Sequence, residues 1–252
     1  MKTNSETYSP IIDLTQSDFL CIKNDVSNVS TNETEPTGGD ARSKYITRRV
    51  ILEDGMDAED LQVYLDVAKP SAGSIKVYGK FMNAADPGDY QEDINWIELE
   101  TNTSPSEVTE EFAEYSYKIP AKSGGIGTTA GIFEYDLSVI PSVGSIVAGS
   151  GYTSAPNISF TGGGGSGLEA TATVSSGALT GITVTNPGRG YTSAPAVVVT
   201  GGGGSGGGGT AAAPATVTYK GYKIFAIKVV PLTTNTVHVP KFKDLRAIAL
   251  QV

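Results

Sequence analysis

The sequence predicts an all-β protein: an antiparallel β-sandwich, jelly-roll-like, with an inserted glycine-rich β-repeat domain and an extended N-terminal arm. Apolar and polar residues alternate in short segments on both sides of the chain's centre, which is the pattern of strands with one buried face. Turn residues separate these segments, and no long helical pattern lies between them. A glycine-rich phrase also occurs twice at a constant spacing.

Residues 1–43 are polar and rich in Ser, Thr and Asn, and we expect them to form the extended arm. Two apolar bursts interrupt this segment, and a purely disordered tail rarely carries such bursts. The arm either docks on a neighbouring protein through them or supplies a first strand to the main domain. The possible docking residues are Ile11, Ile12, Leu14, Phe19, Leu20 and Ile22.

The predicted sandwich comprises residues 44–120 together with 215–252. Period-two alternation is clearest over 61–67 and 75–81, and Gly, Pro and Asp residues mark the turns between the segments. Each such strand is expected to bury one face. Further strands are expected at 45–52, 96–99, 114–120, 222–231 and 244–250.

One segment within the first half of the sandwich has a helical spacing instead. Val108, Phe112 and Tyr115 stand at positions i, i+4 and i+7, which places them on one face of a helix. The sequence therefore predicts a short helix at this place.

An internal repeat separates the two halves of the sandwich. Gly-Tyr-Thr-Ser-Ala-Pro at 151–156 recurs at 190–195, and Thr-Gly-Gly-Gly-Gly-Ser-Gly at 161–167 recurs at 200–206, so both offsets are 39 residues. A constant offset marks an internal structural repeat. We place the repeat domain at 121–214, with short strands joined by glycine turns of positive φ. Since large apolar groups are few, such units should be stabilised by stacking on their neighbours.

Composition argues against several kinds of partner. The formal net charge is −9 and no run of Lys or Arg forms a basic face, so we expect no nucleic-acid partner and no anionic membrane surface. No apolar run approaches the roughly 20 residues that span a bilayer, and no secretory signal is expected. Cys21 is the single cysteine, which rules out an intramolecular disulfide.

No residue pattern points to catalysis, a cofactor or a metal. His238 is the only histidine, and with Cys21 it makes neither a zinc ligand set nor a triad with a supporting context. The acidic runs at 53–60 and 86–93 lack the spacing of a calcium loop. Tyr152 and Tyr191 occupy equivalent repeat positions; each could stack on a host glycan or pack against its own glycine turn, and packing is the favoured alternative.

Several of these segments resemble virion structural proteins of contractile-tailed bacteriophages, especially cyanophages. The resemblance rests on residues 44–50, 60–65, 75–80 and 239–250. The two repeated glycine-rich phrases are similar to repeats of phage tail-fibre and baseplate proteins. The resemblance covers most of residues 44–252.

The repeat, the lack of a catalytic constellation and this resemblance imply a non-enzymatic structural component of a tailed-phage virion. It would belong to the baseplate or tail, or act as a fibre-attachment adaptor, anchored by its N-terminal arm and assembled in the host cytoplasm. Its expected partners are other virion proteins and copies of itself. The alternatives are a host-glycan-binding receptor module and a capsid or neck decoration protein; a glycan depolymerase is the least favoured.

Overall fold

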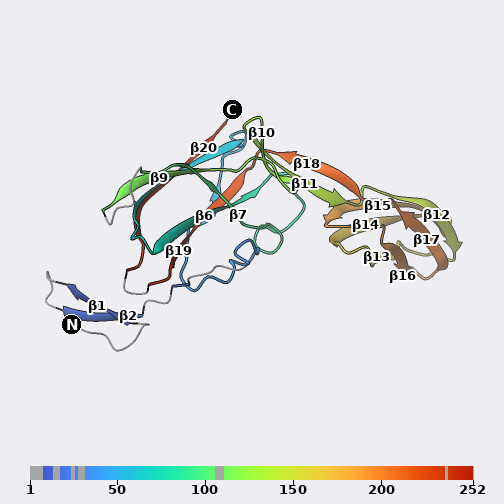
Figure 1. The fold of residues 1–252 in the computed structure, drawn as a ribbon. Coiled ribbons are helices and arrows are strands. Elements are labelled where there is room, and N and C mark those ends of the chain that lie inside the picture. The colour runs from blue at the N-terminus through green and yellow to red at the C-terminus, as the bar shows by residue number, and fades with distance from the viewer. Residues whose placement is uncertain are drawn as a thin grey trace. The chain divides into compact units, whose positions relative to one another are not determined.

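The computed structural model describes residues 8–13, 18–23, 26–27, 32–105, 111–235 and 238–251. Every regular element in this part of the chain is a β-strand, and the sheets are antiparallel, which confirms the predicted all-β fold class (Figure 1). The chain forms two compact units. Unit 1 is made of Met1–Ala84, Tyr90–Glu134 and Lys220–Val252, and unit 2 is made of Ala85–Asp89 and Tyr135–Tyr219.

Unit 1 is a β-sandwich of two sheets. The first has the order β3 (Tyr45–Ile46), β19 (Ile224–Thr233), β6 (Gly73–Met82) and β7 (Ile97–Glu98), and β4 (Val50–Ile51) also pairs with β19. The second has the order β20 (Lys241–Leu250), β5 (Asp60–Ala68), β9 (Ala113–Lys118) and β8 (Glu100–Thr103). The chain passes from the first sheet to the second at Leu99, between β7 and β8.

The alternation predicted for 61–67 is confirmed in β5. Leu61, Val63, Leu65 and Val67 are at most 1% exposed, and the residues between them are half-buried. Each of these side chains contributes about 1.5–3 kcal/mol by leaving water. This strand therefore supplies one face of the sandwich core.

The expectation that each strand buries a single face is wrong for the sheet that contains β6 and β19. Residues Val77–Met82 of β6 and Phe225–Thr233 of β19 are buried on both faces. One face carries Phe81, which packs against Phe133 with ring centroids 5.0 Å apart. The other face is covered by 32–41 and 90–96, so the lysines on it are buried.

Two local predictions in unit 1 are wrong. The segment 45–52 forms only the two-residue edge strands β3 and β4, with every residue of both exposed. Tyr115 lies in strand β9 and Phe112 precedes it, so the predicted helix does not include them; Val108 is outside the described residues. Pairing within the sheet explains the missing helix: β9 pairs with β5 over six residues, which overrides a short helical spacing.

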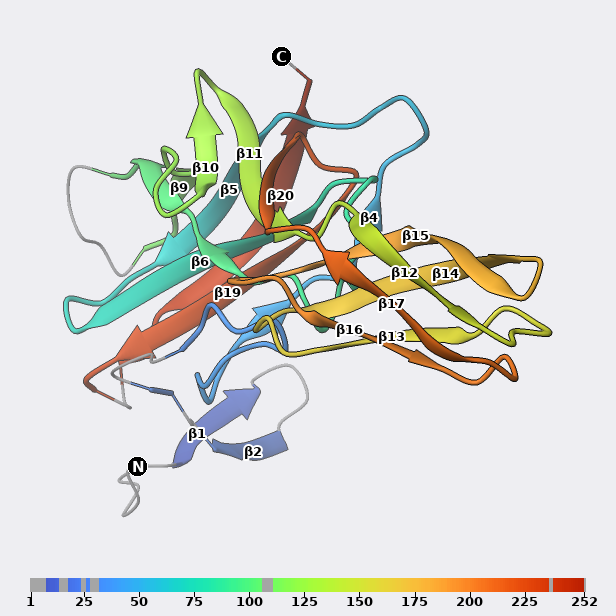
Figure 2. The same ribbon diagram turned by 90° about the vertical axis from the view of Figure 1, so that its right-hand side faces the viewer.

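The N-terminal segment differs from an extended arm. Its described part forms an antiparallel hairpin of β1 (Tyr8–Asp13) and β2 (Asp18–Lys23), in which Ile11 pairs with Leu20 and Ile12 with Phe19 (Figures 1 and 2). Residues 32–41, which the sequence assigned to the arm, pack into the core of unit 1, where the side chains of Glu33 and Ala41 are buried.

Unit 2 contains the repeats, and its limits differ from the predicted 121–214. Residues 121–134 remain in unit 1, where Phe133 N–H donates to Glu59 O and the Lys122 ammonium bonds the Glu134 carboxylate at 2.8 Å. The remaining strands of this part of the chain are β10 (Ile126–Thr129), β11 (Ile132–Val139) and β18 (Ala215–Lys220), which form one three-stranded sheet in the order β10-β11-β18.

At an offset of 39 residues the two repeats are 140–178 and 179–217, and three strands lie wholly or mainly in each. The first has β12 (Val143–Ser150), β13 (Asn157–Thr161) and β14 (Ser166–Ser175), and the second has β15 (Ala178–Arg189), β16 (Ala196–Thr200) and β17 (Ser205–Ala211). Strands β12, β17, β16 and β13 form one sheet, and β14 pairs with β15 (Figure 2). The long ladders β12–β17, β13–β16 and β14–β15 all join one repeat to the other.

The glycine tracts that follow β13 and β16 have the positive φ that was predicted for them. Gly162, Gly163 and Gly164 have φ of 79°, 80° and 80°, and their counterparts Gly201, Gly202 and Gly203 have 78°, 69° and 83°. This left-handed region is open to glycine and costly for other residues. At Gly202 a Cβ would also lie 2.6 Å from Ser154 O, whereas at Gly201 it would meet nothing within 4 Å.

These two neighbouring glycines allow backbone strain to be separated from lack of space. Gly201→Ala is expected to lower the free energy of unfolding by about 1–2 kcal/mol, the cost of a left-handed alanine. Gly202→Ala is expected to cost at least about 2 kcal/mol more, because its methyl group overlaps backbone atoms. Chemical denaturation of both variants checks this difference, and equal losses would contradict the close packing described for Gly202.

Candidate functional site

The strongest cluster of ionisable groups lies on the second face of the β6–β19 sheet in unit 1. The Lys228 side chain on β19 is fully buried. Its ammonium donates to Glu33 Oε2 at 2.9 Å, to Gly38 O at 3.0 Å and to the main-chain carbonyl of Glu33. An ammonium has three N–H donors, and three oxygens accept them here.

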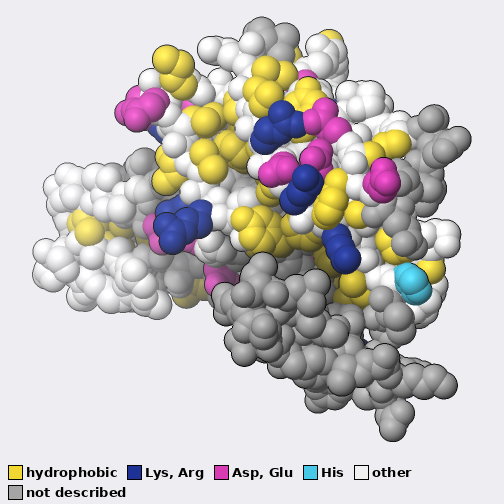
Figure 3. Space-filling view, turned by 90° about the vertical axis from the view of Figure 1, so that its left-hand side faces the viewer, with side chains coloured by type: hydrophobic (Ala, Val, Ile, Leu, Met, Phe, Trp, Pro, Cys, Tyr) yellow, Lys and Arg dark blue, Asp and Glu magenta, His cyan; other side chains and the backbone are white. Residues whose placement is uncertain are grey.

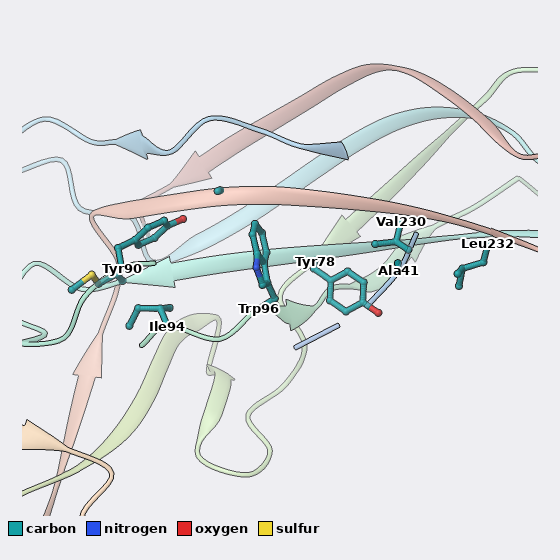
Figure 4. Packing of buried hydrophobic residues seen from close by; sticks show 9 residues of the cluster. Ala41, Tyr78, Tyr90, Ile94, Trp96, Val230 and Leu232 are labelled. Carbon is teal, nitrogen blue, oxygen red and sulfur yellow. The ribbon is translucent and has the colours of Figure 1, made fainter. Parts of the chain in front are cut away.

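Lys80, on the adjacent strand β6, is the second buried lysine of this face. Its ammonium donates to Pro36 O at 2.7 Å and to Gln91 O at 3.0 Å. The Trp96 ring lies near both cations, 4.9 Å from the Lys228 nitrogen and 5.7 Å from the Lys80 nitrogen. Figure 4 shows Trp96 between Tyr90 and Tyr78 along the strands, and these rings add cation–π contacts at 5.0 Å and 4.6 Å.

The charges of the Lys228–Glu33 pair are tuned by burial and by each other. Burial raises the pKa of Glu33, but hydrogen bonds from Lys228 and from the Ala41 N–H, with the positive charges of Lys228 and Lys44, hold that pKa below its ordinary value. Burial lowers the pKa of Lys228, against the opposing effect of Glu33. The segment 33–41 closes tightly around the Glu33 carboxylate, since a Cβ at Gly39 would lie 2.6 Å from Glu33 Cα.

Unit 2 holds a second buried carboxylate, that of Asp86. Its oxygens accept hydrogen bonds from the Tyr135 hydroxyl at 2.6 Å and from Gly88 N–H at 2.8 Å, and Arg189 Nη1 lies 3.5 Å away. The Asp86 side chain is fully buried and that of Arg189 is 14% exposed. The turn predicted at 86–89 therefore carries a structural carboxylate that ties its own loop to β11 and β15.

The repeat tyrosines are buried, at 5% exposure for Tyr152 and 4% for Tyr191. Each packs on the glycine tract of the opposite repeat: a Cβ at Gly204 would lie 2.6 Å from Tyr152 Cγ, and one at Gly165 would lie 2.6 Å from Tyr191 Cγ. The Tyr152 hydroxyl also accepts the Gly207 N–H at 3.0 Å. At these exposures neither ring is open to stack on a sugar. The favoured alternative, packing against a glycine turn, is found, but the turn belongs to the opposite repeat and not to the tyrosine's own.

The structure places the backbone of five of the six docking candidates, and Leu14 lies outside the described residues. Ile11 and Ile12 are on β1, and Phe19, Leu20 and Ile22 are on β2. The hairpin therefore brings the two apolar bursts of the sequence into cross-strand register.

The residues considered for chemistry lie apart from these clusters. Cys21 pairs with Pro10 in the hairpin, and His238 is exposed (Figure 3). Among the described residues, no group of three or more His, Cys, Asp and Glu side chains is arranged to hold a metal ion. In the same part of the chain, no helix has the length and apolar character to cross a membrane. Figure 3 shows hydrophobic, basic and acidic side chains intermingled on one face.

Comparison with known proteins identified no similar protein: no family model, no curated protein and no solved structure matches this chain.

Sequence analysis missed the two buried lysines, which define the site. Lys80 stands in the alternating segment 75–81, and this pattern predicts that it faces solvent. Lys228 stands inside the near-continuous apolar run 224–232, and such a run is typical of a strand buried on both faces. A lysine within such a run is a signal for a buried cation with dedicated acceptors. The acceptors could not be foreseen, because they are the Glu33 carboxylate and main-chain carbonyls of irregular segments outside the two strands.

Neutralising Glu33 tests this ion pair. Above the ordinary carboxyl pKa of 4.5, Glu33→Gln is expected to lower the free energy of unfolding by about 3–5 kcal/mol, because the Lys228 charge stays buried without its counter-charge. Because the folded pKa is depressed, this stabilisation is present above the unfolded value and is lost as pH falls through the folded value. The difference between the two proteins should therefore shrink in acid.

Denaturant unfolding of both proteins between pH 3 and 7 measures this difference. The half-buried Glu35 on the same segment is the matched control, and Glu35→Gln is expected to change the free energy of unfolding by no more than about 0.5 kcal/mol. A cost for Glu33→Gln that does not vary with pH would contradict an ionised Glu33 in the folded state.

Proposed function

We propose that this chain is a non-enzymatic structural component of a tailed-phage virion, most specifically of the baseplate or tail, or an adaptor that attaches a fibre. Its two β units provide the surfaces that contact other proteins of the assembly. The N-terminal hairpin is the element that anchors it to a neighbouring virion protein.

The main support for this proposal is the packing of the repeated glycine-rich phrases inside unit 2. The glycine-rich phrases are the part of the chain that resembles tail-fibre and baseplate proteins. In the structure their tyrosines and glycines pack against one another inside unit 2. Buried ionisable groups such as Lys228, Lys80 and Asp86 are likewise bonded to neighbouring protein groups. Side chains that pack and bond within the protein stabilise its fold, and this supports a structural role.

The hairpin supports the anchoring part of the proposal. A two-stranded hairpin is marginally stable by itself in water, and it gains stability when further strands or an apolar surface cover it. Its strands pair apolar residues, Ile11 with Leu20 and Ile12 with Phe19. A partner that adds a strand to one edge, or receives the hairpin in an apolar groove, would supply this additional stability.

Removal of the N-terminal hairpin tests the anchor. Deleting residues 1–31 removes the hairpin and keeps Glu33 and Ala41, which the core of unit 1 requires. We expect the truncated protein to fold but to be missing from purified virions when it is supplied in place of the full-length protein. Quantitative mass spectrometry of the virions measures the ratio, and a loss of at least tenfold is expected.

A point-variant series guards against a general effect of truncation. Ile12→Asp combined with Phe19→Asp should reduce incorporation, whereas Ser9→Asp in the same hairpin should not. Normal incorporation of the truncated protein would reject the hairpin as the anchor while leaving a virion role intact. Absence of the full-length protein from virions would reject the proposed function itself.

A further inference from the structure

The strands of each repeat of unit 2 pair mainly with strands of the other repeat. The ladders β12–β17, β13–β16 and β14–β15 each join a strand of one repeat to a strand of the other. Within the second repeat, β16 and β17 share only the pair Ala196–Thr210. The backbone hydrogen bonds that hold unit 2 together are therefore made mainly between repeats.

The two repeats are related by a local two-fold arrangement. All five residue pairs of the β12–β17 ladder recur in the β14–β15 ladder when 39 is added to one member and subtracted from the other. Val143–Ala211 corresponds in this way to Ile182–Ala172. In the β13–β16 ladder, Ser159 pairs with its own counterpart Val198, which places the two-fold axis between these two residues.

The loop Gly-Tyr-Thr-Ser-Ala-Pro is reciprocal in the same manner. Thr153 N–H donates to Gly202 O at 2.8 Å, and Thr192 N–H donates to Gly163 O at 2.9 Å. The apolar clusters follow this exchange: Tyr152 shares one with Leu179 of the second repeat, and Tyr191 shares one with Ile140 of the first. Each repeat thus presents donors, rings and apolar side chains that another repeat completes.

We propose that the 39-residue repeat is a self-pairing module whose binding partner is a second repeat of the same kind. In this chain the second repeat is supplied by the same polypeptide. Where one is missing, a second copy of this chain supplies it through an isologous contact about Ser159, with β12 pairing to β14 of the other copy. This inference concerns unit 2 alone and does not depend on a place in a virion.

Deleting residues 179–217 from the chain tests the proposal, because Ala178 and Val217 are equivalent and the deletion keeps the phase of the repeat. The single-repeat chain is expected to have twice as many chains per particle as the full-length protein in light scattering, and to dissociate on dilution. A folded single-repeat chain with the same number of chains per particle as the full-length protein would overturn the proposal.

A disulfide trap reports on the geometry of the new contact. In the single-repeat chain with Cys21→Ser, Ser159→Cys should meet its own copy, since paired Cα atoms about 4.5–5.5 Å apart lie within the range of a disulfide. Oxidation should then give a covalent dimer. Ser150→Cys is the matched control, because Ser150 pairs with the position of Ser166 and not with itself. Equal cross-linking of both variants would overturn the proposed axis.

A second measurement decides the matter if the single-repeat chain does not fold. Gly204→Ala in the full-length protein places a methyl group against Tyr152 and damages the contact of one tyrosine. Mutual dependence of the repeats predicts that hydrogen exchange accelerates at least tenfold in β14 and β15 as well as in β17. Faster exchange confined to β12, β16 and β17 would show that 157–189 folds alone and would overturn the proposal.

Discussion

A buried ammonium group must have its N–H donors accepted, because an unpaired cation in an apolar core costs several kcal/mol. In unit 1 this requirement applies at two positions of the sheet that contains β6 and β19, namely Lys80 and Lys228. Their acceptors are the Glu33 carboxylate and carbonyls of 33–38 and Gln91. The lysines therefore fix two irregular segments over the sheet and turn its second face into a core.

Trp96 shows how these constraints add up. Its ring lies near both ammonium groups, and its main-chain N–H donates to Thr34 O at 3.2 Å. Its indole N–H has no hydrogen-bond partner among the described residues, which costs about 1–3 kcal/mol. The ring position is thus set by the cations and by packing with Tyr78 and Tyr90, at the expense of one hydrogen bond.

Unit 2 is stabilised mainly by backbone pairing and glycine packing, with few charged groups. Glycines with positive φ allow the two tracts to approach Tyr152 and Tyr191, and the strands of each repeat are paired by those of the other. Few large side chains are needed, since much of the stability comes from backbone ladders that neither repeat can form alone. Repetition in the sequence therefore produces pairing between repeats rather than a simple stack.

Local pattern was sufficient for part of this fold. The strict alternation of 61–67 gave β5, and the constant offset identified the repeat with its glycine turns. Non-local contacts decide the rest. Burial of Lys80 depends on carbonyls 44 and 11 residues away, and Tyr152 packs on a glycine tract 50 residues later. No periodicity encodes such partners, so the site had to be found in the structure.

Amine-reactive labelling of the native protein measures whether the two lysines are buried. Under mild acetylation followed by peptide mass spectrometry, Lys80 and Lys228 should stay unmodified until the protein is unfolded, while the exposed Lys241 and Lys243 react within minutes. Modification of Lys228 in the native protein at the rate of Lys243 would show that its ammonium group is open to solvent and not held by Glu33 and Gly38.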